Sequence, residues 1–99
     1  MAAADKKIVL VTGAGTGIGW ETVKALFQSR QSYHILLGTQ SLPDGEHALA
    51  ELREAVPETR STAELLQVEM TSDDSIARAF DAVRSAHGRL DVLVNNAGA

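Results

Sequence analysis

Apolar and polar positions along this chain follow two alternating periods. Short apolar runs predict four buried strands, at Ile8–Val11, Tyr33–Leu37, Ala63–Val68 and Asp91–Val94. The longer segments between them carry apolar residues at helical spacing and predict three helices, over Gly17–Ser29, Leu42–Val56 and Ser72–His87. Strands that alternate with helices are typical of an α/β fold with a parallel sheet covered on both faces.

The last predicted helix has signals at both of its ends. Thr71–Asp74 has the form of a capping box, with Asp in place of the usual Glu, and Gly88 stands where a left-handed cap is expected. The middle helix begins less clearly, because Pro43 and Gly45 fall in its first turn. The last helix also has an apolar face made of Ile76, Ala79, Phe80 and Val83.

A glycine-rich turn follows the first predicted strand. Thr12–Gly19 reads T-G-A-G-T-G-I-G, with the spacing G-x-x-x-G-x-G rather than G-x-G-x-x-G. A turn of this kind between a strand and a helix lets backbone N–H groups approach a phosphate, and the helix N-terminus adds partial positive charge. Glycines alone would also suit a simple turn. The Asn-Asn-Ala-Gly motif at Asn95–Gly98, behind the fourth strand, favours a dinucleotide site instead.

Each residue of the turn has an expected role. Gly13 makes the turn, Gly17 admits a pyrophosphate, and Gly19 lets the helix pack close to the strand. The remaining residues are expected to line the loop, and they are Ala14, Gly15, Thr16 and Ile18.

With these two motifs about eighty residues apart, the chain resembles the amino-terminal half of a short-chain dehydrogenase/reductase. The resemblance implies a Rossmann-like, doubly wound parallel sheet with strand order 3-2-1-4, truncated after the fourth strand. It implies that Thr12 and the amides of Asn95 and Asn96 hold the first and fourth strands in register. By the same resemblance Asn96, Ala97 and Gly98 pass beside the adenosine ribose.

The catalytic residues of that family are not found in this sequence. The resemblance places a Ser and a Tyr-x-x-x-Lys pair downstream of Asn-Asn-Ala-Gly, and the only tyrosine, Tyr33, has no lysine four positions on. Residues 1–99 are therefore expected to form an incomplete NAD(P)-binding domain that is inactive alone. The alternative is a non-catalytic binding module or a subunit-pairing fragment. The open edge of the fourth strand predicts oligomers or aggregation.

The turn after the second strand bears on cofactor choice. An NAD site usually places an acid there, whereas this chain has Thr39, followed by the neutral donors Gln40 and Ser41. NADP is the expected cofactor. NAD stays an alternative, because Gln40 and Thr16 stand where NADP-using relatives often carry basic residues. The resemblance also assigns adenine contacts to Glu69 and to the backbone of Met70, although Glu69 is equally compatible with a solvated carboxylate.

The composition of the chain argues against two classes of binding partner. The net charge of −4 without a basic cluster argues against nucleic acid and anionic membrane, and the chain has no cysteine. No apolar run approaches the length of a membrane span or a signal peptide, so a cytoplasmic location is expected. His34, His47 and His87 fall in a strand start and on two separate helices without metal-ligand spacing. They are expected to have surface or packing roles, with no metal site.

Overall fold

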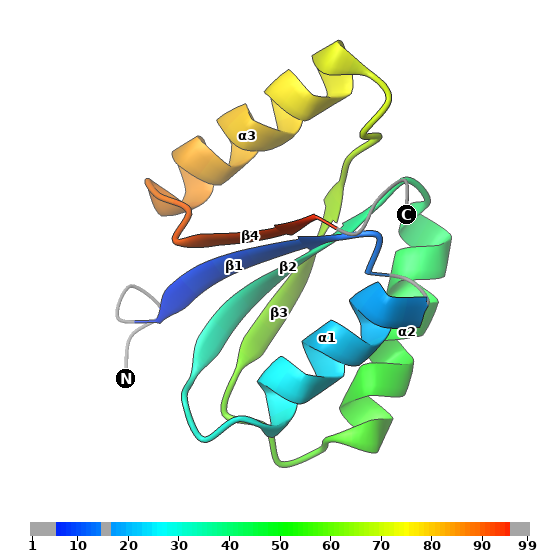
Figure 1. Cartoon of the computed structure of the whole chain (residues 1–99), viewed down its shortest axis with the longest axis vertical. Coiled ribbons are helices and arrows are strands. Elements are labelled where there is room, and N and C mark those ends of the chain that lie inside the picture. The colour runs from blue at the N-terminus through cyan, green and yellow to red at the C-terminus, as the bar shows by residue number, and fades with distance from the viewer. Residues whose placement is uncertain (1–5, 15–16, 96–99) are drawn as a thin grey trace.

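The computed structural model describes residues 6–14 and 17–95. Four parallel strands form one sheet in the order β3-β2-β1-β4, as expected from the sequence. The strands are β1 (Lys7–Thr12), β2 (Tyr33–Thr39), β3 (Thr62–Gln67) and β4 (Val92–Asn95). The helices are α1 (Gly17–Gln28), α2 (Leu42–Ala55) and α3 (Asp73–His87). Figure 1 shows α1 and α2 on one face of the sheet and α3 on the other.

The apolar runs of β1 and β2 fill both faces of the sheet because successive side chains of a strand point to opposite sides. Val9 and Val11 of β1 join the core beneath α1 and α2, which includes Val23, Phe27, Ile35, Leu37 and Leu52. Ile8 and Leu10 point the other way and pack with Leu36, Val83 and partly buried neighbours beneath α3. The sheet is therefore doubly covered, as its continuous apolar strands predict.

Helix α3 begins one residue later than the capping box predicts. Its N-cap is Ser72, whose hydroxyl accepts a hydrogen bond from the Ser75 N–H at 3.2 Å. The Thr71 hydroxyl instead donates to Glu69 at 3.0 Å, so the box expected over Thr71–Asp74 is wrong. The reason is that Ser72 takes the extended backbone of an N-cap, with φ −118° and ψ 113°. Gly88 ends the helix in the left-handed region, with φ 74°, as predicted.

Helix α2 also begins with a serine cap, although Pro43 and Gly45 lie in its first turn. The Ser41 hydroxyl accepts from the Asp44 N–H at 3.4 Å, and Pro43 lies where a missing N–H breaks no helical hydrogen bond. Strand β2 runs on to Thr39, two residues past its expected end. The cap and the longer strand place Thr39, Gln40 and Ser41 at the carboxyl edge of the sheet, close to the end of β1.

None of the helices in the described part of the chain is long and apolar enough to cross a bilayer.

Candidate functional site

The turn after β1 has the backbone geometry that its glycines permit. Gly13 and Gly17 have φ values of 62° and 61°, in the left-handed region that side chains with a Cβ seldom adopt. Ala14 is fully buried, and its N–H donates to the Gly38 carbonyl of β2 at 3.2 Å. The end of β2 therefore anchors the turn, and α1 starts with an exposed Gly17.

Gly19 sets how closely α1 approaches β1. A Cβ placed on Gly19 would lie 2.7 Å from the carbonyl carbon of Gly13 and 3.1 Å from the Cα of Ala14. Only a residue without a side chain fits there, which agrees with the packing expected of Gly19. At Gly17 a Cβ would meet no atom within 4 Å among the residues that the structure describes, so the backbone there faces open space in that part of the chain. An open helix N-terminus is an arrangement that suits an anion.

That open region is part of a crevice of about 710 Å³ between the glycine turn and α2. Gly13, Gly17 and Trp20 line one side of it, and the end of β2 lines the next. The sequence analysis did not identify the third side, which is made of the α2 residues Asp44, His47 and Glu51. The signal for them is their spacing of three and four residues, which puts them on one face of a helix. His47 and Glu51 pair across that face at 2.6 Å.

Thr39 lies in the crevice wall, but its hydroxyl is already engaged. It donates to the Ser41 carbonyl at 2.9 Å and accepts from the Ser41 N–H at 3.2 Å. The side chain is only 9% exposed and packs closely against Gly45 of α2. The local turn thus uses the donor that the sequence analysis assigns to a ligand, and a contact between Thr39 and a ligand stays a prediction. Gln40 is exposed and takes the position nearest to solvent.

A second hollow of about 330 Å³ continues the site beyond β2. Gln40 and Glu69 line it together with Ser75 and Arg78 of α3, two residues that the sequence analysis did not select. The Glu69 N–H donates to the Ser75 hydroxyl at 2.8 Å, and its exposed carboxylate accepts from Thr71. Glu69 thus lies at a hollow large enough for a ligand and also within a local hydrogen-bond network. Met70, next to it, is half-buried.

The end of β4 is tied to β1 as the second motif implies. Thr12 is paired with Asn95 in the sheet, and its hydroxyl donates to the Asn95 side-chain oxygen at 2.8 Å. This bond fixes the register of the two strands that flank the point where the strand order reverses. Ile18, which is also predicted for the site, is exposed in the first turn of α1. The other residues predicted for the site lie outside the described residues, and they are Gly15, Thr16, Asn96, Ala97 and Gly98.

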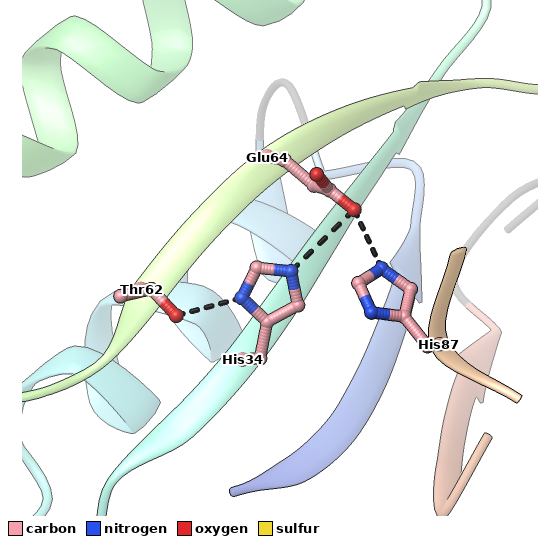
Figure 2. A network of polar contacts seen from close by, with 4 residues as sticks. All are labelled: His34, Thr62, Glu64 and His87. Carbon is pink, nitrogen blue, oxygen red and sulfur yellow. Dashed lines mark hydrogen bonds and ion pairs between the residues drawn. The ribbon is translucent and has the colours of Figure 1, made fainter. Parts of the chain in front are cut away.

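Two of the three histidines lie together, although they come from a strand and a helix that are far apart in the sequence. His34 at the start of β2 and His87 at the end of α3 have ring centroids 4.9 Å apart, and both approach Glu64 of β3 (Figure 2). Parallel pairing aligns His34 with Thr62, and Glu64 stands two residues further on the same face. No spacing within the sequence reveals this cluster, because three separate elements supply it. It lies at the edge of the sheet opposite to the glycine turn.

Comparison with known proteins identifies what this chain is similar to. Residues 7–99 match the family model described as short chain dehydrogenase. A short-chain dehydrogenase/reductase of Talaromyces stipitatus, tropE, is 52% identical over 98 residues, which cover 99% of this chain and 37% of that protein. The chain therefore spans little more than a third of that relative's length.

Two solved structures show the same arrangement of elements. The menthone neomenthol reductase from Mentha piperita has a TM-score of 0.83 and 30% identity, over 96% of this chain and 32% of that one. A metagenomic short-chain oxidoreductase in complex with NADP has a TM-score of 0.79 and 30% identity, over 99% of this chain and 42% of that one.

Proposed function

The chain belongs to the short-chain dehydrogenase family, and on this premise we propose that it binds NADP in the crevice between its glycine turn and α2. The observation that carries the proposal is the close approach of Gly19 to Gly13, which leaves the N-terminus of α1 facing open space at Gly17. The backbone there suits a pyrophosphate, because several N–H groups and the positive end of the helix dipole point to one place.

The two hollows that meet at Gln40 give the adenosine end of the cofactor a place. Gln40 and Ser41 are proposed to face the ribose, with Glu69 and Met70 nearer to the adenine. Arg78, which lines the second hollow, supplies a cation on the side away from the glycine turn. In this assignment Gly15, Thr16, Ile18, Asn96, Ala97 and Gly98 complete the contacts by resemblance to the family.

NADP is preferred over NAD because no carboxylate occupies the end of β2. An acid there would hydrogen-bond the two ribose hydroxyls of NAD and repel the 2′-phosphate of NADP. The solved relative in complex with NADP supports the same choice. The carboxylate of Asp44 argues against a preference for NADP, because it also lines the crevice. NAD therefore stays the second candidate.

The activity proposed for the complete protein is hydride transfer between the nicotinamide ring and an alcohol or carbonyl carbon. Bound NADPH would supply the hydride, while the residues in this chain bind and orient the dinucleotide. The family match favours this oxidoreductase function over a non-catalytic module. The 99 residues contain no Tyr-x-x-x-Lys, so we expect the chain alone to bind cofactor without turnover.

Trp20 offers a direct assay of this proposal. It is the only tryptophan of the chain and it lines the crevice, so bound NADPH should quench its emission by energy transfer. Displacement of NADPH by 2′,5′-ADP more readily than by 5′-ADP is expected if the 2′-phosphate is recognised. No change in Trp20 emission at millimolar NADPH would refute binding, and equal displacement by the two nucleotides would refute the preference for NADP.

Two further expectations belong to the proposal. Val92 and Leu93 of β4 are 42% and 46% exposed, and among the described strands β4 pairs with β1 alone. We propose that this edge pairs with another strand, which in the isolated chain gives oligomers or aggregates. Elution as a monomer at every concentration in size-exclusion chromatography would argue against this. A cytoplasmic location is also proposed, and cell fractionation tests it.

A further inference from the structure

A cluster of polar side chains lies under the last turn of α3, away from the dinucleotide crevice. His34 of β2, Glu64 of β3 and His87 of α3 point toward one another, and Figure 2 shows the Glu64 carboxylate between the two rings. His34 and His87 have side chains only 12% and 17% exposed, while Glu64 is 49% exposed. The two imidazoles are therefore largely enclosed and the carboxylate opens the cluster to solvent.

The three donor atoms are spaced as ligands of one ion would be. His87 Nε2 lies 2.8 Å and His34 Nε2 lies 3.4 Å from the same Glu64 oxygen, and all three atoms lie within 4.8 Å of one another. Ligands at about 2.0–2.2 Å from a tetrahedral zinc ion lie roughly 3.3–3.6 Å apart. A shift of a few tenths of an ångström at Glu64 and an approach of the two rings by up to about 1.5 Å would place the three atoms at that spacing.

The position of His34 Nε2 is unusual for a buried polar atom. It lies at ion-pair distance from the Glu64 carboxylate, 3.4 Å, but makes no well-formed hydrogen bond with any residue that the structure describes. A buried polar atom without a full hydrogen bond is a candidate ligand for an ion.

We propose that His34, Glu64 and His87 bind one divalent transition-metal ion, with Zn²⁺ as the best match, and that this ion fastens α3 to the sheet. Two imidazoles and a carboxylate are a ligand set that zinc uses with water at the fourth position, and the exposed side of Glu64 leaves room for that water. The proposal does not depend on dinucleotide binding, because the crevice and the cluster lie at opposite edges of the sheet.

The surroundings of His34 suit a metal-bound imidazole. Its other nitrogen, Nδ1, lies 2.6 Å from the Thr62 hydroxyl. When Nε2 binds a cation, Nδ1 carries the proton and donates it to that oxygen. A threonine hydroxyl accepts as readily as it donates, so Thr62 can accept this hydrogen bond after a rotation of its O–H bond.

The place of the cluster at a helix end also favours a cation. His87 is the last residue of α3, where the negative end of the helix dipole attracts positive charge. A bound ion would thus join two strands to a helix end.

The test is a titration of the untagged 99-residue chain with Co²⁺, followed by competition with Zn²⁺. Because the chain has no cysteine, any visible Co²⁺ band comes from nitrogen and oxygen ligands alone. The matched control is His47→Gln, which removes a histidine that also pairs with a glutamate, Glu51, but belongs to no group of three candidate ligands in the described part of the chain. Circular dichroism on each variant checks that it folds.

We expect one equivalent of Co²⁺ to bind with a tetrahedral spectrum, Zn²⁺ to displace it, and Zn²⁺ to raise the melting temperature. His87→Gln and Glu64→Gln should abolish the band, His47→Gln should leave it unchanged, and Thr62→Val should weaken Zn²⁺ roughly 10–100-fold. Thr62 is exposed on β3, and the Thr62→Val variant keeps all three ligands. This variant therefore still tests the proposal if a variant of one of the ligands fails to fold. Absence of saturable binding, or binding lost equally in His47→Gln, would overturn the proposal.

Discussion

Replacing Gly17 by alanine separates ligand exclusion from backbone strain, because Gly88 provides a matched position elsewhere in the chain. Gly17 has φ 61° and Gly88 has φ 74°, and a Cβ at either position meets nothing within 4 Å. The two substitutions therefore impose the same kind of strain without a clash. A non-glycine residue in this region loses about 1 kcal/mol or somewhat more, which lowers the melting temperature of a domain this size by roughly 4–8 °C.

The two variants should differ only in dinucleotide binding. The methyl group at Gly17 would project into the open space at the N-terminus of α1, where the pyrophosphate is proposed to lie. An overlap worth about 1.4 kcal/mol weakens NADPH tenfold, so Gly17→Ala should lose at least that factor. Gly88 caps α3 at the far edge of the sheet. The Gly88→Ala variant should therefore bind NADPH as the unchanged chain does.

The measurement is a thermal melt of each variant together with a titration of Trp20 emission with NADPH. We expect the two variants to lose the same stability. Only Gly17→Ala should bind NADPH more weakly. Unchanged binding in Gly17→Ala would show that the pyrophosphate does not pass that point. An equal binding defect in Gly88→Ala would show that affinity follows global stability, and the assignment of the crevice would then fail.

Three other outcomes follow from the same contacts. Gln40→Arg adds a cation beside the proposed 2′-phosphate and should tighten NADPH roughly tenfold over NADH in the Trp20 titration; tighter NADH instead would count against this placement. The unchanged chain should not oxidise NADPH with a panel of carbonyl compounds, and turnover that survives repurification and disappears in Gly17→Ala would contradict that. The Ile8 N–H and then Arg89 lower the pKa of Asp91 below 3.8, so its contribution to stability is present above pH 3.8 and is lost as the pH falls further. Asp91→Asn should therefore have lower stability at pH 7 and a smaller pH dependence of stability below pH 4, as measured by unfolding followed with circular dichroism; an unchanged pH dependence would contradict this role of Asp91.

The fold was predictable because its signals are local. The apolar runs of β1 and β2 are long enough to be buried on both faces, and right-handed crossovers leave few ways to order four parallel strands. Errors arose where two adjacent residues compete for one role. Thr71 and Ser72 both have hydroxyls suited to an N-cap, and the backbone of Ser72, which the sequence does not specify, decides between them.

The candidate site was predictable only on the side that the glycines build. Gly13, Gly17 and Gly19 act through the backbone, and their spacing carries that information directly. Thr39 illustrates the limit: its residue type indicates a neutral donor, but the sequence does not show that its hydroxyl bonds to the Ser41 carbonyl in the local turn. Residues on α2 and α3 that line the hollows depend on the angle at which each helix packs, which no local pattern encodes.

The histidine cluster lies furthest from sequence reasoning, and the cause is the geometry of parallel sheets. His34 and Glu64 are thirty residues apart and meet only because β2 and β3 pair in the register that aligns His34 with Thr62. His87 reaches them from the opposite direction, since α3 runs back along the sheet and ends beside the starts of the strands. Metal-ligand spacing along one helix or loop is readable in a sequence, whereas a site shared by three elements becomes readable only after strand order and register are known. The crossover through α3 therefore gathers this second set of ligands at the edge of the sheet opposite to the dinucleotide crevice.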